Sequence, residues 1–155
     1  KQMNDAGNFV PLVAKKATVA KSETPIIMRW DYNALADKDA LAGNPTIEVV
    51  IPPSAVIAGV YIQAISAYAP HPNAAKLWME YLYSDEGQLV WLKGYCHPIR
   101  YNDLAARNVI PADLAAKLPS ADLYAKAVFP SIDQINNAKQ VIADQWMTAV
   151  GADVK

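Results

Sequence analysis

The chain has 155 residues, of which 53% are hydrophobic and 19% are charged, and its net charge is −1. This length can bury a core, and the composition is typical of a folded globular protein rather than a disordered one. The near-neutral charge offers no broad basic field, so no nucleic-acid partner is expected. The single cysteine, Cys96, excludes an intrachain disulfide, and no run of about 18 apolar residues predicts a membrane-spanning helix.

The first 45 residues contain two predicted helices with a short strand between them. Apolar residues recur every three or four positions over 8–22, which predicts an amphipathic helix with Pro11 in its first turn. The apolar run at 25–29 contains β-branched residues and predicts a buried strand. A second helix is expected over 32–41, because the Gly-Asn-Pro sequence that follows is a strong helix-ending signal.

Two further strands are predicted, at 46–50 and 56–65, and a Pro-Pro pair ends the first of them. A proline-rich turn then leads into an amphipathic helix with Pro72 in its first turn, where a missing N–H has no partner to lose. Ser84 is the predicted N-cap of the next helix, which runs to about residue 92 and has acidic residues in its first turn.

The last third of the chain is predicted to be helical. A loop over 93–100 precedes three short helical pieces that prolines separate, over residues 102–107, 111–117 and 120–127. Ser131 and Gln134 form a capping-box sequence that opens a long helix over 132–149. With few strands and many helices, the sequence predicts an α/β fold, helix-rich with a small mixed sheet whose edges stay open.

The stretch from Gly59 to Trp91 carries a family resemblance. It consists of an apolar strand, the sequence APHPNAA, an aromatic amphipathic helix and the sequence SDEGQ. In this order it resembles the C-terminal half of the bacterial extracellular solute-binding proteins that serve ABC importers. More narrowly, it resembles the type II periplasmic group, which includes ferric-iron, polyamine, thiamine and phosphonate binders. The resemblance implies a type II periplasmic-binding-protein fold.

The same resemblance implies a receptor that closes two lobes around a small solute and delivers it to an ABC permease, without chemistry. Residues 1–45 then form the end of the second lobe. Residues 46–155 form the C-terminal part of the first lobe, with a crossover strand and a helical tail. Family members are considerably longer, so we expect a fragment that lacks the N-terminal lobe. The implied location is periplasmic or extracellular, with membrane association through the transporter.

The most suggestive site is the sequence Trp30-Asp31-Tyr32, at the end of a predicted strand, where open α/β sheets bind ligands. An indole beside a carboxylate suits an ammonium ligand, through cation–π attraction and charge pairing. The residues alone favour a structural interpretation, in which Asp31 caps the next helix and Trp30 packs in the core. The resemblance favours a binding site, because family members place ligand-contacting residues after this strand.

The departures from the family pattern narrow the expected ligand. Ferric-binding relatives place two adjacent tyrosines near this position, whereas Trp30-Asp31-Tyr32 offers only one, so ferric iron is not expected. Polyamine-binding relatives use tryptophan and carboxylates. The resemblance therefore implies an organic cation such as a polyamine, or another small polar molecule.

Three more residues are candidate ligand contacts. Tyr61 follows Gly59, a glycine that predicts a bulge or a close backbone approach. Relatives present a side chain to the cleft at the Tyr61 position, although the sequence alone favours a half-buried strand aromatic. Gln63 lies two residues after Tyr61, on the same face of the predicted strand, and could supply an amide to the ligand. Arg100 could pair with an anionic ligand, although such an arginine is more often a surface or lobe-bridging residue.

No catalytic residue, metal site or cofactor is predicted. Cys96 and His97 are adjacent, which is poor geometry for a nucleophile and its base, and no third partner follows at a recognisable spacing. Zinc would need more ligands than these two residues and the remote His71. The sequence contains no P-loop, GxGxxG or GxSxG motif.

Two other functions remain open from the residues. The first is a small helical protein-interaction domain whose binding face carries Trp78, Tyr81 and Trp91. The second is a hydrolase built on Cys96 and His97, which requires an activated thiol.

Overall fold

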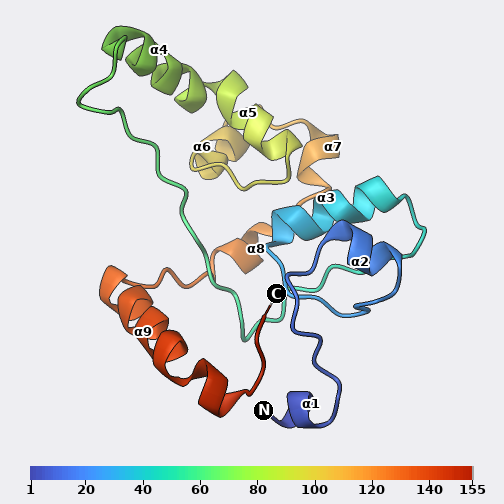
Figure 1. The fold of residues 1–155 in the computed structure, drawn as a ribbon. Coiled ribbons are helices and arrows are strands. Elements are labelled where there is room, and N and C mark those ends of the chain that lie inside the picture. Colours follow the sequence, from blue (N-terminus) through green and yellow to red (C-terminus); the bar gives the residue numbers. More distant parts are fainter. Residues whose placement is uncertain (155) are drawn as a thin grey trace.

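The computed structural model describes residues 1–154 and shows a helical chain with long extended connections (Figure 1). In chain order the helices are α1 (Gln2–Asp5), α2 (Lys16–Ala20), α3 (Asp31–Leu41), α4 (Pro72–Tyr83), α5 (Asp85–Lys93), α6 (Tyr101–Ala106), α7 (Ala112–Ala115), α8 (Ala121–Tyr124) and α9 (Ile132–Ala149). Helices α4 to α7 gather at one end of the molecule, and α9 stands apart from them (Figure 1).

Local signals set the boundaries of the best-formed helices as the sequence predicts. Pro72 is the first residue of α4. The Ser84 hydroxyl accepts the Gly87 N–H at 3.1 Å and caps α5. The Ser131 hydroxyl accepts the Gln134 N–H at 3.2 Å, while the Gln134 side chain accepts the Ser131 N–H at 2.8 Å. This reciprocal pair confirms the predicted capping box of α9.

The helix predicted over 8–22 is wrong for its first half, because only Lys16–Ala20 is helical there. Around Pro11 the chain makes a tight turn, in which the Leu12 N–H donates to the Val10 carbonyl at 2.9 Å. Pro11 has no N–H, so it cannot donate a backbone hydrogen bond in this segment. The helix begins only after Lys15, whose backbone N–H donates to the Thr18 hydroxyl at 3.2 Å.

The predicted small mixed sheet is not formed within residues 1–154. Segment 56–58 makes a single parallel bridge, in which the Ala58 N–H donates to the Val128 carbonyl and the Val128 N–H to the Val56 carbonyl, both at 2.9 Å. The segments at 25–29 and 46–50 form no helix and belong to no strand ladder, and Pro25 and Ile26 lie in a bend. A ladder needs a second strand alongside, and these segments do not lie edge to edge.

The best-packed region is the corner between α4, α5 and α6. Leu92 and Leu104 are fully buried there. Gln88 is buried between them and the backbone: its amide donates to the Leu82 carbonyl at 2.7 Å, and its side-chain oxygen accepts the Arg100 N–H at 3.0 Å. One side chain thus joins the end of α4, the body of α5 and the start of α6.

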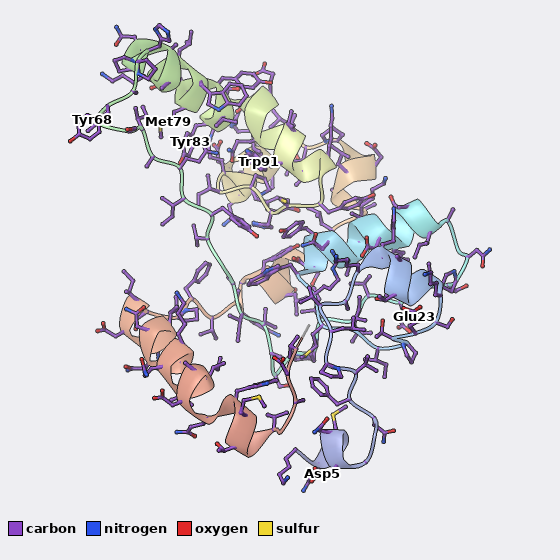
Figure 2. The ribbon with its side chains drawn as sticks, in the orientation of Figure 1. Asp5, Glu23, Tyr68, Met79, Tyr83 and Trp91 are labelled. Carbon is purple, nitrogen blue, oxygen red and sulfur yellow. The ribbon has the colours of Figure 1, made fainter. Side chains whose placement is uncertain are left out.

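Much of the apolar surface is uncovered. The chain exposes 11634 Å², whereas a compact protein of this mass exposes about 7,700 Å². The apolar stripe of α9, with Ile132 and Ile142, faces solvent, and α9 has no buried residue. Tyr68 points outward from the long connection before α4 (Figure 2). The described chain therefore leaves more surface open than a self-contained domain does.

A surface ion network ties α5 to α6. The Arg107 guanidinium donates to both carboxylate oxygens of Asp85, at 2.7 and 2.8 Å, and to both oxygens of Asp103, at 2.8 and 3.1 Å. Arg100 lies 3.2 Å from Asp85 and also pairs with Asp103. Hydrogen bonds from Arg107, and then from Arg100, lower the pKa of Asp103 from 3.8 to about 2.

We expect Arg107→Gln to make the free energy of unfolding depend less on pH under acidic conditions. Because the folded pKa of Asp103 lies below its unfolded value of 3.8, its contribution is present above that value and is lost as the pH falls towards about 2. The groups are exposed, so the effect is small. The measurement is the urea midpoint at several pH values through this window. Lys93→Gln, which removes an exposed cation at the end of α5, is the control, and parallel curves for the two variants would refute the expectation.

Candidate functional site

Asp31 lies at the start of α3, with both carboxylate oxygens held by neutral donors. The N-cap residue of the helix is Trp30, so Asp31 occupies the first turn rather than the cap. One carboxylate oxygen, Oδ1, accepts the Tyr32 N–H at 2.8 Å. The other, Oδ2, accepts the Tyr124 hydroxyl at 2.9 Å. The carboxylate is half-buried, and these two bonds fix its orientation.

Within residues 1–154, the negative charge of Asp31 has no ion-pair partner. The neighbouring cation, Arg29, is paired with Asp37 instead. Among residues 1–154, no lysine, arginine or histidine nitrogen lies within 4.0 Å of the Asp31 carboxylate. A carboxylate with only neutral donors can still accept a charge-assisted hydrogen bond from a cationic group.

Two tyrosines from separate parts of the sequence, Tyr32 and Tyr61, contact each other through their side chains. The hydroxyl oxygens of Tyr32 and Tyr61 lie 2.9 Å apart, and their rings meet edge to face with centroids 6.5 Å apart. The hydrogen bond with Tyr32 is the main cause that raises the pKa of Tyr61 above its ordinary value. Tyr61 therefore presents a phenol hydroxyl at neutral pH, not a phenolate.

Trp30 adds an open aromatic face. Its side chain is 49% exposed, so it is not a core residue. A Cβ on Gly59 would lie 3.2 Å from Cη2 of this indole, closer than ordinary van der Waals contact. The predicted close approach at Gly59 is thus confirmed, and the atom that approaches is the Trp30 ring. We call Trp30, Asp31, Tyr32 and Tyr61 the Asp31 cluster.

The other two candidate contacts lie outside this cluster. Gln63 is exposed, and the described structure gives its amide no hydrogen bond to the cluster. Arg100 is engaged with Asp85 and Asp103, and it donates to the Tyr83 carbonyl. Its guanidinium acts as a link between helices in this structure.

The structure brings in Tyr101 and Tyr124, two aromatic residues that the sequence did not indicate as site residues. The His97 ring contacts Tyr124 and Tyr101 in tilted arrangements, with centroids 4.1 Å and 4.4 Å apart. Desolvation lowers the pKa of His97, while the charge of Asp31 opposes the shift. Tyr124 follows Asp31 by 93 residues, and nothing in its own short helix, α8, marks it for a site.

The thiol of Cys96 is not activated. Burial, and then the charge of Asp31, raise its pKa above the ordinary value, which disfavours the thiolate that a cysteine hydrolase needs. Within residues 1–154, no group of three or more histidine, cysteine, aspartate or glutamate side chains is arranged to hold a metal ion.

The aromatic face on α4 and α5 is exposed. Trp78 and Tyr81 stack with centroids 5.5 Å apart, and both are open to solvent. Trp91 of α5 is also exposed, and Figure 2 labels it. Such a patch fits either an interaction face or a surface that another part of a larger protein covers.

Comparison with known families decides the class of protein. A family model described as bacterial extracellular solute-binding protein matches residues 1–138. The chain belongs to this family. A search of curated proteins found no match for this solute-binding protein. The matched range includes the whole Asp31 cluster and both rings that contact His97. None of the helices within residues 1–154 is long and apolar enough to cross a membrane.

Proposed function

We propose that this solute-binding protein contributes the Asp31 cluster to a receptor for a small organic cation, such as a polyamine. The receptor delivers its ligand to an ABC importer without chemical change. One observation supports the ligand class above all: the Asp31 carboxylate is oriented by two neutral donors and has no cationic partner among residues 1–154. An ammonium group supplies the missing charge.

The groups around the carboxylate suit the same ligand. The open indole face of Trp30 attracts a cation through its ring quadrupole. The hydroxyl pair of Tyr32 and Tyr61 keeps acceptor lone pairs that an ammonium N–H can use. Carboxylate, aromatic face and hydroxyl oxygens together match an alkyl ammonium better than an anion or a sugar.

We assign residues 1–45 to the end of the second lobe and residues 46–155 to the first lobe. Trp30, Asp31 and Tyr32 come from the first range and Tyr61 from the second, so the cluster takes residues from both. The unpaired segments of predicted strand and the large exposed area support the view that the rest of a two-lobed receptor covers this surface. The two parts already meet in the structure, where the hydroxyls of Tyr32 and Tyr61 lie 2.9 Å apart, so hinge closure of the lobes would enclose the solute at this junction.

The partners follow from this assignment. The solute is taken up outside the cytoplasm, in the periplasm or at the cell exterior, and an ABC permease in the membrane receives it. The receptor reaches the membrane through that permease. No step of this cycle needs a cofactor or a catalytic group.

Calorimetric titration of the full-length receptor tests the ligand class. We expect putrescine to bind, and 1,4-butanediol, its neutral analogue of the same length, to bind far more weakly. Trp30→Ala should weaken putrescine binding by roughly 3- to 30-fold, because a cation–π contact contributes about 0.5–2 kcal/mol. The matched control is Trp78→Ala, an exposed indole on α4.

Two outcomes would contradict the proposal. Equal affinity for the diamine and the diol would mean that charge plays no part in recognition. Equal loss of affinity in Trp30→Ala and Trp78→Ala would mean that the indole of Trp30 is not at the site.

A further inference from the structure

Tyr124 comes from the helical tail and reaches the carboxylate at the centre of the proposed solute site. Its hydroxyl donates to Oδ2 of Asp31 at 2.9 Å across 93 residues of sequence. The other oxygen, Oδ1, is held by the N–H of the next residue, Tyr32. Among residues 1–154, Tyr124 therefore supplies the one hydrogen bond to the carboxylate that comes from outside α3.

The ring of Tyr124 is itself held in place. The His97 ring contacts it in a tilted arrangement with centroids 4.1 Å apart, and Tyr101 contacts His97 in the same way with centroids 4.4 Å apart. Desolvation, and then the charge of Asp31, raise the pKa of the Tyr124 hydroxyl well above its ordinary value. The hydroxyl is thus always protonated at physiological pH and always available as a donor.

Cys96 lies close enough to Asp31 for the charge of that carboxylate to affect the pKa of the thiol. The charge of Asp31 adds to the burial that raises the pKa of the Cys96 thiol. Cys96 is the one cysteine of the chain, so its reactivity reports the position of the Asp31 carboxylate without any ligand.

We propose that Tyr124 is a positioning residue of the solute site, which orients the Asp31 carboxylate towards a cationic ligand. Tyr124 itself does not touch the solute and acts through Asp31. This inference rests on the proposed function, because it takes the Asp31 cluster as the place where the cation binds.

The test is a double-mutant cycle in the full-length receptor, with putrescine as the probe. We expect Tyr124→Phe to weaken putrescine binding by about tenfold, the effect of one lost hydrogen bond to a charged group. In an Asp31→Ala background the same change should have no further effect, because the side-chain oxygens that accept the Tyr124 hydroxyl are gone. Tyr101→Phe is the matched control: its ring also contacts His97, and its hydroxyl does not bond to Asp31.

The pH dependence of Cys96 alkylation by iodoacetamide gives a readout that needs no ligand. Asp31→Asn should lower the pKa of the thiol, since it removes a negative charge. Tyr124→Phe should shift the profile in the same direction, because the released carboxylate turns towards solvent. Tyr101→Phe should leave the profile unchanged.

The outcomes separate the two proposals. If Asp31→Asn abolishes putrescine binding while Tyr124→Phe matches the wild type in both assays, the positioning role is wrong and the proposed function stands. If the wild type does not bind putrescine, the proposed ligand is wrong, and the alkylation profile alone decides whether Tyr124 positions Asp31.

Discussion

Asp31→Asn is expected to weaken putrescine binding to the full-length receptor by about 100-fold. Removing one member of a desolvated charge pair costs about 2–5 kcal/mol, and a half-buried site lies near the lower end of that range. The substitution keeps the size of the side chain and one acceptor oxygen, so the loss comes mainly from the charge. Calorimetric titration at constant ionic strength measures it, since salt screens part of the attraction.

The control for this variant is Asp122→Asn. Asp122 is exposed on α8, two residues before Tyr124, and removing its charge changes the net charge by the same amount. We expect Asp122→Asn to bind putrescine as the wild type does. If both variants lose affinity equally, the attraction comes from the overall charge of the protein and not from a carboxylate at the site.

The parts of the fold that the sequence predicts well are set by neighbouring residues. Ser84 and Ser131 cap helices with bonds that span three residues, and α5 and α9 begin where these serines indicate. The first half of the helix predicted over 8–22 is not formed, because a local turn around Pro11 replaces it in spite of the apolar spacing. A capping bond is decided within one turn of chain, whereas apolar spacing leads to a helix only when the rest of the chain covers that face.

The sheet could not be judged from local pattern in the same way. Segments 25–29 and 46–50 have the composition of strands, yet a strand pairs only when another lies beside it. The candidate site likewise combines residues that the local pattern indicates with a contact that only the folded chain creates. Trp30 and Asp31 stand out because they end an apolar segment, but the hydrogen bond from Tyr124 depends on how the tail folds back over 93 residues. No spacing rule relates residues so far apart.

Gly87→Ala is expected to destabilise the α4–α5 corner by about 3 kcal/mol or more, which places it among the larger effects of single substitutions. A Cβ at this position would lie 2.1 Å from the Tyr81 carbonyl oxygen and 2.9 Å from Cα of Leu82. Both are backbone atoms, so no side-chain rotation relieves the overlap and the helices must move apart. Equilibrium unfolding in urea, followed by far-UV circular dichroism, measures the change in free energy of unfolding.

Opening the corner also breaks the bonds that pass through it. Gln88, the residue after Gly87, donates to the Leu82 carbonyl at 2.7 Å and accepts the Arg100 N–H at 3.0 Å, and both bonds need the present spacing of α4, α5 and α6. Glu86→Ala is the matched control, because it adds no atom near α4 and loses only a favourable acid in the first helical turn, worth about 0.3–1 kcal/mol. If Gly87→Ala unfolds at the same urea concentration as Glu86→Ala, the two helices do not approach as closely as the structure places them.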